Sequence, residues 1–139
     1  MNYLLDTCVI SELIKKEPNP KVVKWISDIE ETNLFISVLT IGELHKGIEK
    51  LSESRKKDKL LKWIAYDMTK RFQNKIIDFD LHTAVIWGKI QAKSEMSGQK
   101  LPAIDSLIAA TGISHDLIIV TRNTTDMKSS GVELFNPWE

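Results

Sequence analysis

Four acidic side chains could do chemistry together if the fold gathers them: Asp6, Glu43, Asp105 and Asp126. Carboxylates that lie close together without Lys or Arg partners repel one another and raise one another's pKa. Such a cluster is stable at neutral pH when a cation lies between its members. Carboxylate oxygens prefer Mg²⁺ or Mn²⁺ to Zn²⁺, so the four acids predict a site for a hard divalent metal ion.

Each acid also has a purely structural explanation. Asp6 stands where it could cap the following helix, and Thr40 with Glu43 has the spacing of a Ser/Thr-x-x-Glu capping box. The negative charge of Asp105 could interact favourably with the dipole of its helix, and Asp126 could be a turn residue. For any one acid taken alone we expect the structural role, and only the four together indicate a binding site.

Other metal-binding side chains are dispersed. His45, His82 and His115 lie in different parts of the chain, and Cys8 is the only cysteine. A zinc site needs such residues clustered, so none is predicted. His45 lies two residues after Glu43, which on a helix places it on the opposite side.

The composition is that of one ordinary globular domain, expected over residues 1–139. Apolar residues make up 42% of the chain and charged residues 27%, which argues against disorder. No apolar run approaches the roughly 20 residues that cross a bilayer, and no signal peptide is visible. A single cysteine excludes an internal disulfide, so we expect a cytoplasmic protein with no membrane contact.

The charges balance overall but not locally. Lys plus Arg and Asp plus Glu both number 19, and residues 46–75 hold ten basic and four acidic side chains. This basic segment could bind a polyanion. It could equally be the solvated face of a helix.

Five short apolar runs predict strands: 3–5, 34–36, 76–77, 117–120 and 132–135. Helical patterns separate them, and this alternation predicts an α/β fold with a central parallel sheet covered on both faces. Ligands bind at the edge where the strands end. Asp6, Glu43 and Asp126 are therefore expected at that edge, whereas Asp105 is harder to place because its helix precedes a strand.

Apolar spacing also predicts which helix faces point inward. After Asp6, the expected inner side is Val9, Leu13 and Ile14, and Glu12 is on the other side. A long helix ending near Phe72 should bury Leu60, Ile64, Met68 and Phe72. A later helix should carry one face made of Leu81, Val85, Gly88 and Ala92.

Four segments resemble the four motifs of the PIN domain, most closely those of its VapC and FitB-like toxins: 5–7 with 9–11, 40–44 with 47–48, 105–110, and 120–123 with Asp126. The ending, from Gly131-Val132 to Asn136-Pro137-Trp138, is also similar. The resemblance spans almost the whole chain in the right order. It implies a three-layer α/β/α fold, a homodimer, and an Mg²⁺-dependent endoribonuclease that is the toxin of a type II toxin–antitoxin system. Such toxins cut structured RNA, commonly tRNA or ribosomal RNA, and are silenced by a cognate VapB-like antitoxin.

The family's metal-site acids correspond to Asp6, Glu43 and Asp105. At the fourth position an acid often stands where this chain has Asn123, and Asp126 could replace or supplement it. Cys8 is a second departure, because Asn or Ser is usual there.

The resemblance implies hydrolysis by a metal-activated water, which leaves a 5′-phosphate and a 3′-hydroxyl. Thr121 and Asn123 could orient the water or a ligand. Lys46, Lys50 and Arg55 could grip the RNA backbone, with an affinity that falls as salt rises.

Two other functions remain open. A phosphoacceptor signalling domain also places Asp at a strand end, but it needs a Lys after a late strand, where this chain has Thr121-Arg122-Asn123. A catalytically impaired PIN fold that only binds RNA or a protein is the other alternative; Asp6, Glu43 and Asp105 argue against it, whereas Cys8 and Asn123 keep it open.

Overall fold

A computed structural model describes all 139 residues and confirms the predicted α/β class. The sheet contains β1 (Tyr3–Leu5), β2 (Leu34–Ser37), β3 (Ile76–Ile77), β4 (Ile118–Val120) and β5 (Leu134–Phe135). All neighbouring strands are parallel, in the order β3-β2-β1-β4-β5. The last strand is shorter than predicted, because only two of its residues pair with β4.

The strand order reverses beside β1. The chain builds outward from β1 through β2 to β3, then returns to the other side of β1 to form β4 and β5. In an open parallel sheet the crevice at such a reversal is the usual ligand site, because the connections on its two sides cover opposite faces of the sheet. The residues after β1 and β4 are therefore the first place to look for function.

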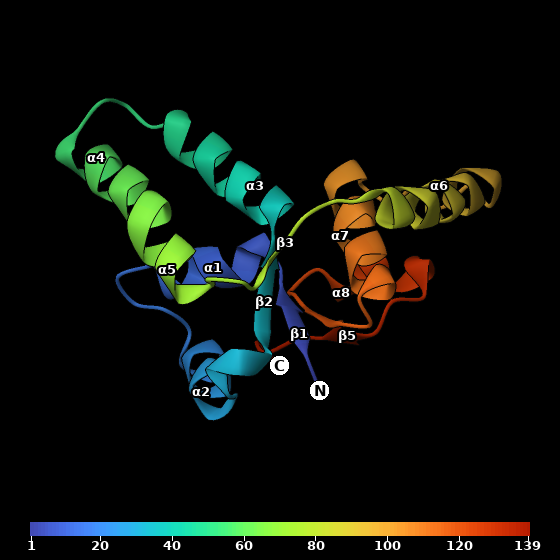
Figure 1. Cartoon of the computed structure of the whole chain (residues 1–139), viewed down its shortest axis with the longest axis horizontal. Coiled ribbons are helices and arrows are strands. Elements are labelled where there is room, and N and C mark those ends of the chain that lie inside the picture. The colour runs from blue at the N-terminus through green and yellow to red at the C-terminus, as the bar shows by residue number, and fades with distance from the viewer.

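Helices cover both faces of the sheet (Figure 1). One layer holds α1 (Thr7–Leu13), α2 (Pro20–Asp28), α3 (Val38–Glu49), α4 (Arg55–Lys62) and α5 (Thr69–Arg71). The other holds α6 (Leu81–Met96), α7 (Ala103–Ser114) and α8 (Thr124–Met127). Leu5 belongs to the hydrophobic core under the first layer and Leu4 to the core under the second, since successive strand side chains point to opposite faces.

The long helix predicted to end near Phe72 is present, but its middle is wound differently. A π-helical segment, Trp63–Met68, joins α4 to α5. Thr69, the first residue of α5, donates a hydrogen bond from its Oγ1 back to the Ile64 carbonyl oxygen of this segment at 3.2 Å. Ile64, Met68 and Phe72 are buried as predicted, and Leu60 is half-buried against the same core, so the apolar spacing identified the inner face.

The prediction for α1 was partly wrong. The helix ends at Leu13, and Ile14 is exposed. Glu12, expected on the solvated side, is buried at 5% exposure. The burial is tolerable because its carboxylate accepts hydrogen bonds from Lys15 Nζ and the Asn19 backbone N–H, both at 3.0 Å.

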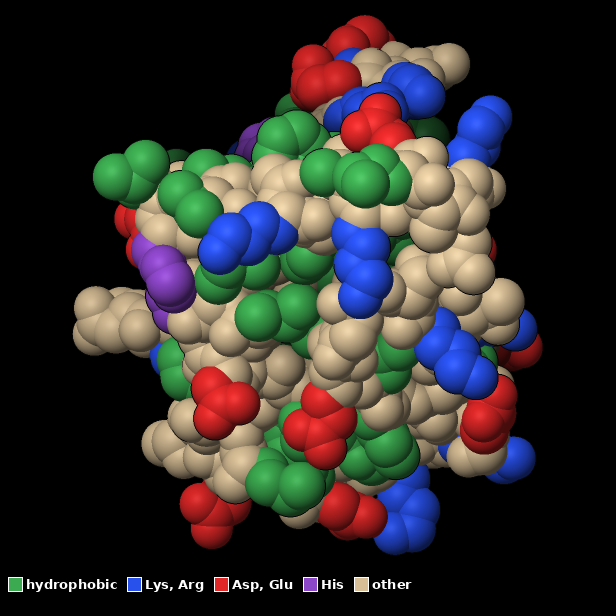
Figure 2. Space-filling model, turned by 90° about the vertical axis from the view of Figure 1, so that its right-hand side faces the viewer, with side chains coloured by type: hydrophobic (Ala, Val, Ile, Leu, Met, Phe, Trp, Pro, Cys, Tyr) green, Lys and Arg blue, Asp and Glu red, His purple; other side chains and the backbone are tan.

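The predicted face of α6 lies on the surface. Leu81 and Val85 are 81% and 52% exposed. α6 packs on α7 through another face, where Thr83 Oγ1 donates to Ser114 Oγ and Trp87 Nε1 donates to Ser106 Oγ, both at 2.9 Å. Polar pairs thus hold the helix and leave apolar side chains outward; Figure 2 shows apolar side chains gathered on one face of the molecule. None of the helices combines the length and apolarity needed to cross a bilayer.

The approach of α7 to the sheet depends on Gly112. A Cβ at this position would lie 2.5 Å from Ile119 Cδ1 and 3.0 Å from Val132 Cγ2. Ile119 is fully buried and cannot move freely. We expect Gly112→Ala to lower the free energy of unfolding by about 1–2 kcal/mol through overpacking, measured by urea denaturation.

The matched control is Gly88→Ala on α6, where a Cβ would meet nothing within 4 Å. It should raise stability by about 0.5–1 kcal/mol through helix propensity alone. A Gly112→Ala variant as stable as this control would show that the close contact costs nothing.

Candidate active site

An open cavity of about 400 Å³ lies where β1 and β4 end. Three of the four predicted acids line it: Asp6, Glu43 and Asp105. They come from α1's cap, α3 and α7, and thus from both helical layers. The fold therefore brings together side chains that the sequence separates, Asp105 included, although its helix precedes a strand.

Asp6 is the most buried of these acids, at 4% exposure. Its Oδ1 accepts a hydrogen bond from the Thr7 backbone N–H at 2.8 Å, so the helix-capping role is real. Its Oδ2 accepts one from Thr121 Oγ1 at 2.7 Å, across the gap between β1 and β4. Burial raises the pKa of Asp6 although these hydrogen bonds act to lower it. Capping thus uses one oxygen, and Thr121 fixes the other.

The capping-box explanation of Glu43 is wrong. Ser37 caps α3 by accepting from the Leu39 N–H at 3.0 Å, which places Thr40 inside the helix. Glu43 Oε1 instead accepts a hydrogen bond from Thr7 Oγ1 at 2.6 Å. The Glu43 carboxylate is thus held beside the residue that follows Asp6, at the cavity.

Asp105 has the most perturbed environment of the three. It stands in the first turn of α7, and the N-cap Pro102 provides no capping side chain. Burial, followed by the charges of Asp6, Asp126 and Glu43, raises the pKa of Asp105 to about 6, and no hydrogen bond from the protein opposes the shift. The side chain is therefore a carboxylate with charged neighbours of its own sign.

The two candidates for the fourth position are placed differently. Asn123 lines the cavity. Asp126 is exposed in the first turn of α8 and lines a separate hollow that also includes Lys100 and Lys128. Its charge still contributes to the raised pKa of Asp105. The role predicted for Asp126 as a ligand stays a prediction.

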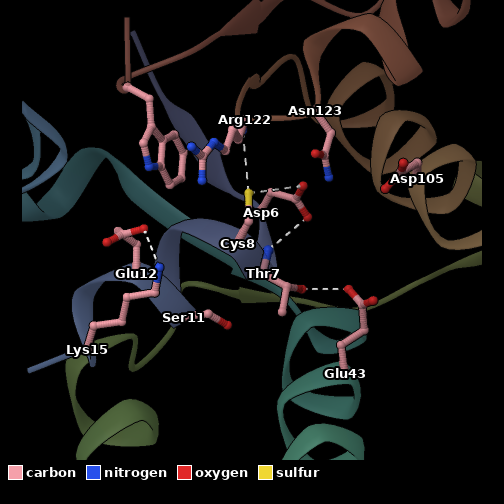
Figure 3. Close-up of a pocket in the computed structure, with 11 residues that line it drawn as sticks. Asp6, Thr7, Cys8, Ser11, Glu12, Lys15, Glu43, Asp105, Arg122 and Asn123 are labelled. Atoms are coloured by element: carbon pink, nitrogen blue, oxygen red, sulfur yellow. Dashed lines mark hydrogen bonds and ion pairs between the residues drawn. The ribbon is translucent and has the colours of Figure 1, made fainter. Parts of the chain in front are cut away.

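The three acids line one side of the cavity without converging on one point. Figure 3 shows Asp6, Glu43 and Asp105 on the same side of it, yet no three acidic, His or Cys side chains are placed to ligate one ion together. This donor set still fits Mg²⁺, which keeps several waters and is usually held by one or two carboxylates. Remaining acids can then act through the ion's waters.

Sequence reasoning missed the opposite end of the cavity, which is formed by Glu12, Lys15, Arg122 and Trp138. Lys46, Lys50 and Arg55, predicted to grip RNA, do not line the cavity. Arg122 could have been found, because it lies two residues after the end of a predicted strand. Nothing in the sequence connects Trp138 with Glu12.

Cys8 fits into the network around Asp6. Its Sγ accepts from the Arg122 backbone N–H at 3.5 Å and lies 3.7 Å from Asp6 Oδ2. Burial, and then the charge of Asp6, raises the pKa of the Cys8 thiol. The thiol is therefore protonated at neutral pH and can donate weakly to the carboxylate, which an Asn or Ser at this position would do more strongly.

Known proteins resemble this chain along its whole length. Toxin FitB of Neisseria gonorrhoeae is 34% identical over 135 residues, which are 97% of this chain and 97% of that protein. The VapC ribonuclease Y4jK of Sinorhizobium fredii is 29% identical over 136 residues, 98% of this chain and 97% of that protein.

Solved structures give the same result. The crystal structure of FitAcB from Neisseria gonorrhoeae superimposes with a TM-score of 0.93 at 34% identity, covering 99% of both chains. VapBC2 of Rickettsia felis, bound to a DNA fragment from its promoter, gives 0.81 at 26% identity over 98% of both chains. A sequence model of the PIN domain matches residues 3–128. This chain therefore belongs to the PIN domain family.

Proposed function

We propose that this protein is a Mg²⁺-dependent endoribonuclease and the toxin of a type II toxin–antitoxin system, acting on structured RNA such as tRNA or ribosomal RNA in the cytoplasm. Its relatives named as toxins and ribonucleases, FitB and VapC, match it from end to end. Mn²⁺ should substitute for Mg²⁺, since both prefer oxygen ligands.

One observation carries the proposal: the raised pKa of Asp105 beside two other carboxylates in an open cavity. An arrangement that only stabilised the fold would pair these charges with Lys or Arg. None of the chain's four ion pairs involves Asp6, Glu43 or Asp105. Uncompensated repulsion of this kind is typical of a site built to bind a cation.

The chain's own side chains then have separate tasks. Asp6, Glu43 and Asp105 would hold Mg²⁺ directly or through its waters. Bound there, the ion supplies a water of lowered pKa and neutralises charge on the phosphoryl oxygens. Thr121 keeps Asp6 oriented through its hydrogen bond, and Asn123, which lines the cavity, would orient a water or the RNA. Attack by water leaves a 5′-phosphate and a 3′-hydroxyl.

The pKa of Asp105 predicts how stability depends on pH without metal. An Asp in an unfolded chain has a pKa of about 3.9. Between that value and about 6, the folded protein keeps a proton that the unfolded chain has lost, so the free energy of unfolding falls as pH rises. Asp105→Asn removes this cost.

In EDTA near pH 7.5, we expect Asp105→Asn to raise stability by about 1 kcal/mol, a value reduced from the full shift because the group is partly solvated. The melting temperature should rise by about 3 °C, with little change near pH 4. Mg²⁺ should raise the melting temperature of the wild type more than that of the variant. A variant that is less stable than the wild type at both pH values would show that Asp105 is not repelled.

Glu43→Gln tests the metal site. Gln can still accept the hydrogen bond from Thr7, so stability should change by less than about 0.5 kcal/mol. Mg²⁺-dependent cleavage of tRNA, followed on gels, should fall by about 100-fold or more, since even the outer partners of metal ligands cost 10–100-fold. Glu49→Gln, the same change on an exposed part of α3, is the control.

Cleavage at the wild-type rate by Glu43→Gln would remove Glu43 from the mechanism. A wild-type protein that binds tRNA but never cuts it with Mg²⁺ or Mn²⁺ would instead support the catalytically impaired binding module.

A cognate VapB-like antitoxin and a second copy of this chain are the protein partners that we propose. Apolar surface that a dimer would cover is exposed on two helices: at Leu81, Val85 and Met96 of α6, and at Ile104 and Ile113 of α7.

We expect Val85→Glu to shift the protein from dimer to monomer in light scattering. Thr32→Glu, which adds an equal charge at an exposed residue just before β2, should not. A Val85→Glu variant that stays dimeric would exclude this surface as the interface.

A further inference from the structure

We propose that Arg122, held in position by Trp138, binds a backbone phosphate of the RNA at the end of the cavity opposite the acids. The inference rests on the proposed nuclease function. It names the side chain of that site that would contact the RNA directly and not through a metal ion. Figure 3 shows Arg122, Glu12 and Lys15 on the far side of Asp6 from Asp105.

Arg122 is fixed at both its backbone and its side chain. It follows β4, and its backbone N–H donates to Cys8 Sγ at 3.5 Å. The guanidinium carbon lies 5.3 Å from the centre of the Trp138 ring, which is the geometry of a cation–π contact. None of the ion pairs of the chain includes Arg122. Its charge and its donors are thus available to an anion.

Trp138 is itself anchored rather than lying loosely at the chain end. Its indole packs against the larger hydrophobic core, and its backbone N–H donates to Asn136 Oδ1 at 2.8 Å. Trp138 lines the same cavity as Glu12 and contributes, after Lys15 and Asn19, to lowering the pKa of Glu12. Glu12 and the last residues of the chain thus belong to the same end of the cavity.

This arrangement explains why a carboxylate is buried in α1. Glu12 is 5% exposed, and a buried charge needs several donors to be tolerated. Those donors are Lys15 Nζ and the Asn19 backbone N–H, both in the segment between α1 and α2. Together with Trp138, which packs against the core, they form a rigid support under Arg122, whereas an unsupported Arg side chain would lose considerable entropy when it bound a ligand.

The cavity thus has two ends of opposite character. The acidic end suits a cation, and the Arg122 end suits an anion whose oxygens match a planar guanidinium, for which phosphate is the usual partner. A nucleic acid carries phosphates on both sides of the bond to be cut. With a cation at the acidic end, one phosphate could lie there while a neighbouring phosphate meets Arg122, so RNA backbone matches both ends of the cavity at once.

The test measures binding of fluorescein-labelled tRNA to the full chain in EDTA, by anisotropy over a series of salt concentrations. Without metal no metal-dependent cleavage interferes. We expect Arg122→Ala to weaken binding about tenfold, as for a lost hydrogen bond between charged groups. The slope of log affinity against log salt should decrease by about 1 because one phosphate contact is lost.

Trp138→Leu separates positioning from charge. It should weaken binding by about two- to fivefold, as for a lost cation–π contact, and leave the salt slope unchanged because the Arg122 charge remains. Trp138→Phe keeps an aromatic ring and should restore most of the affinity. Lys21→Ala, which removes an exposed charge on α2, should leave both quantities unchanged. Thermal melts of each variant show whether it is folded.

Wild-type affinity and salt slope for a folded Arg122→Ala variant would overturn the inference, even where Mg²⁺-dependent cleavage stands. The same result with a weakened antitoxin complex would assign Arg122 to the protein partner instead. Failure of the wild type to cut RNA with Mg²⁺ would overturn the proposed function, and the salt slopes would still decide whether Arg122 contacts phosphate.

Discussion

The hydrogen bond from the Thr121 hydroxyl to the buried carboxylate of Asp6 joins the ends of β1 and β4, the two strands on either side of the point where the sheet order reverses. The Asp6 backbone N–H donates in addition to the Val120 carbonyl oxygen at 3.0 Å. These contacts hold together, at one edge of the sheet, the segments that lead from β1 and β4 into helices of the two layers. Because Asp6 also caps α1, the same residue fixes the start of the helix that carries Thr7, the partner of Glu43.

The site that results is organised by charge. Asp6, Glu43 and Asp105 face one part of the cavity without basic partners, and Arg122 faces another, where the only carboxylate, that of Glu12, is paired with Lys15. In a domain with no net charge, such local separation has to be maintained by rigid structure, since unpaired charges left mobile would pair with each other. Short hydrogen bonds fix Asp6 and Glu43, and the indole of Trp138 fixes the guanidinium.

Local sequence patterns predicted the positions of the buried strands well. They predicted the inward faces of the helices correctly in some cases and wrongly in others. Strands buried on both faces are nearly continuous apolar runs, so their positions followed directly from the sequence. The inner face of α6 did not, because polar pairs attach this helix to α7, and a stripe such as Leu81 and Val85 cannot reveal whether it packs inward or stays exposed. Glu12 was misplaced for the same reason, since its burial depends on donors distant along the chain.

By itself, the sequence determined the parallel α/β arrangement, the position of Asp6 at a strand end and the set of acids from which a site could form, because these depend on local periodicity and on the direction of parallel strands. Only the tertiary structure decided which acids meet. It placed Asn123 in the cavity wall and Asp126 outside it, gave Glu43 a partner in Thr7 instead of a cap, and brought Trp138 from the end of the chain to Arg122. Those contacts join residues far apart in the sequence, whose proximity is set by how helices pack across the sheet.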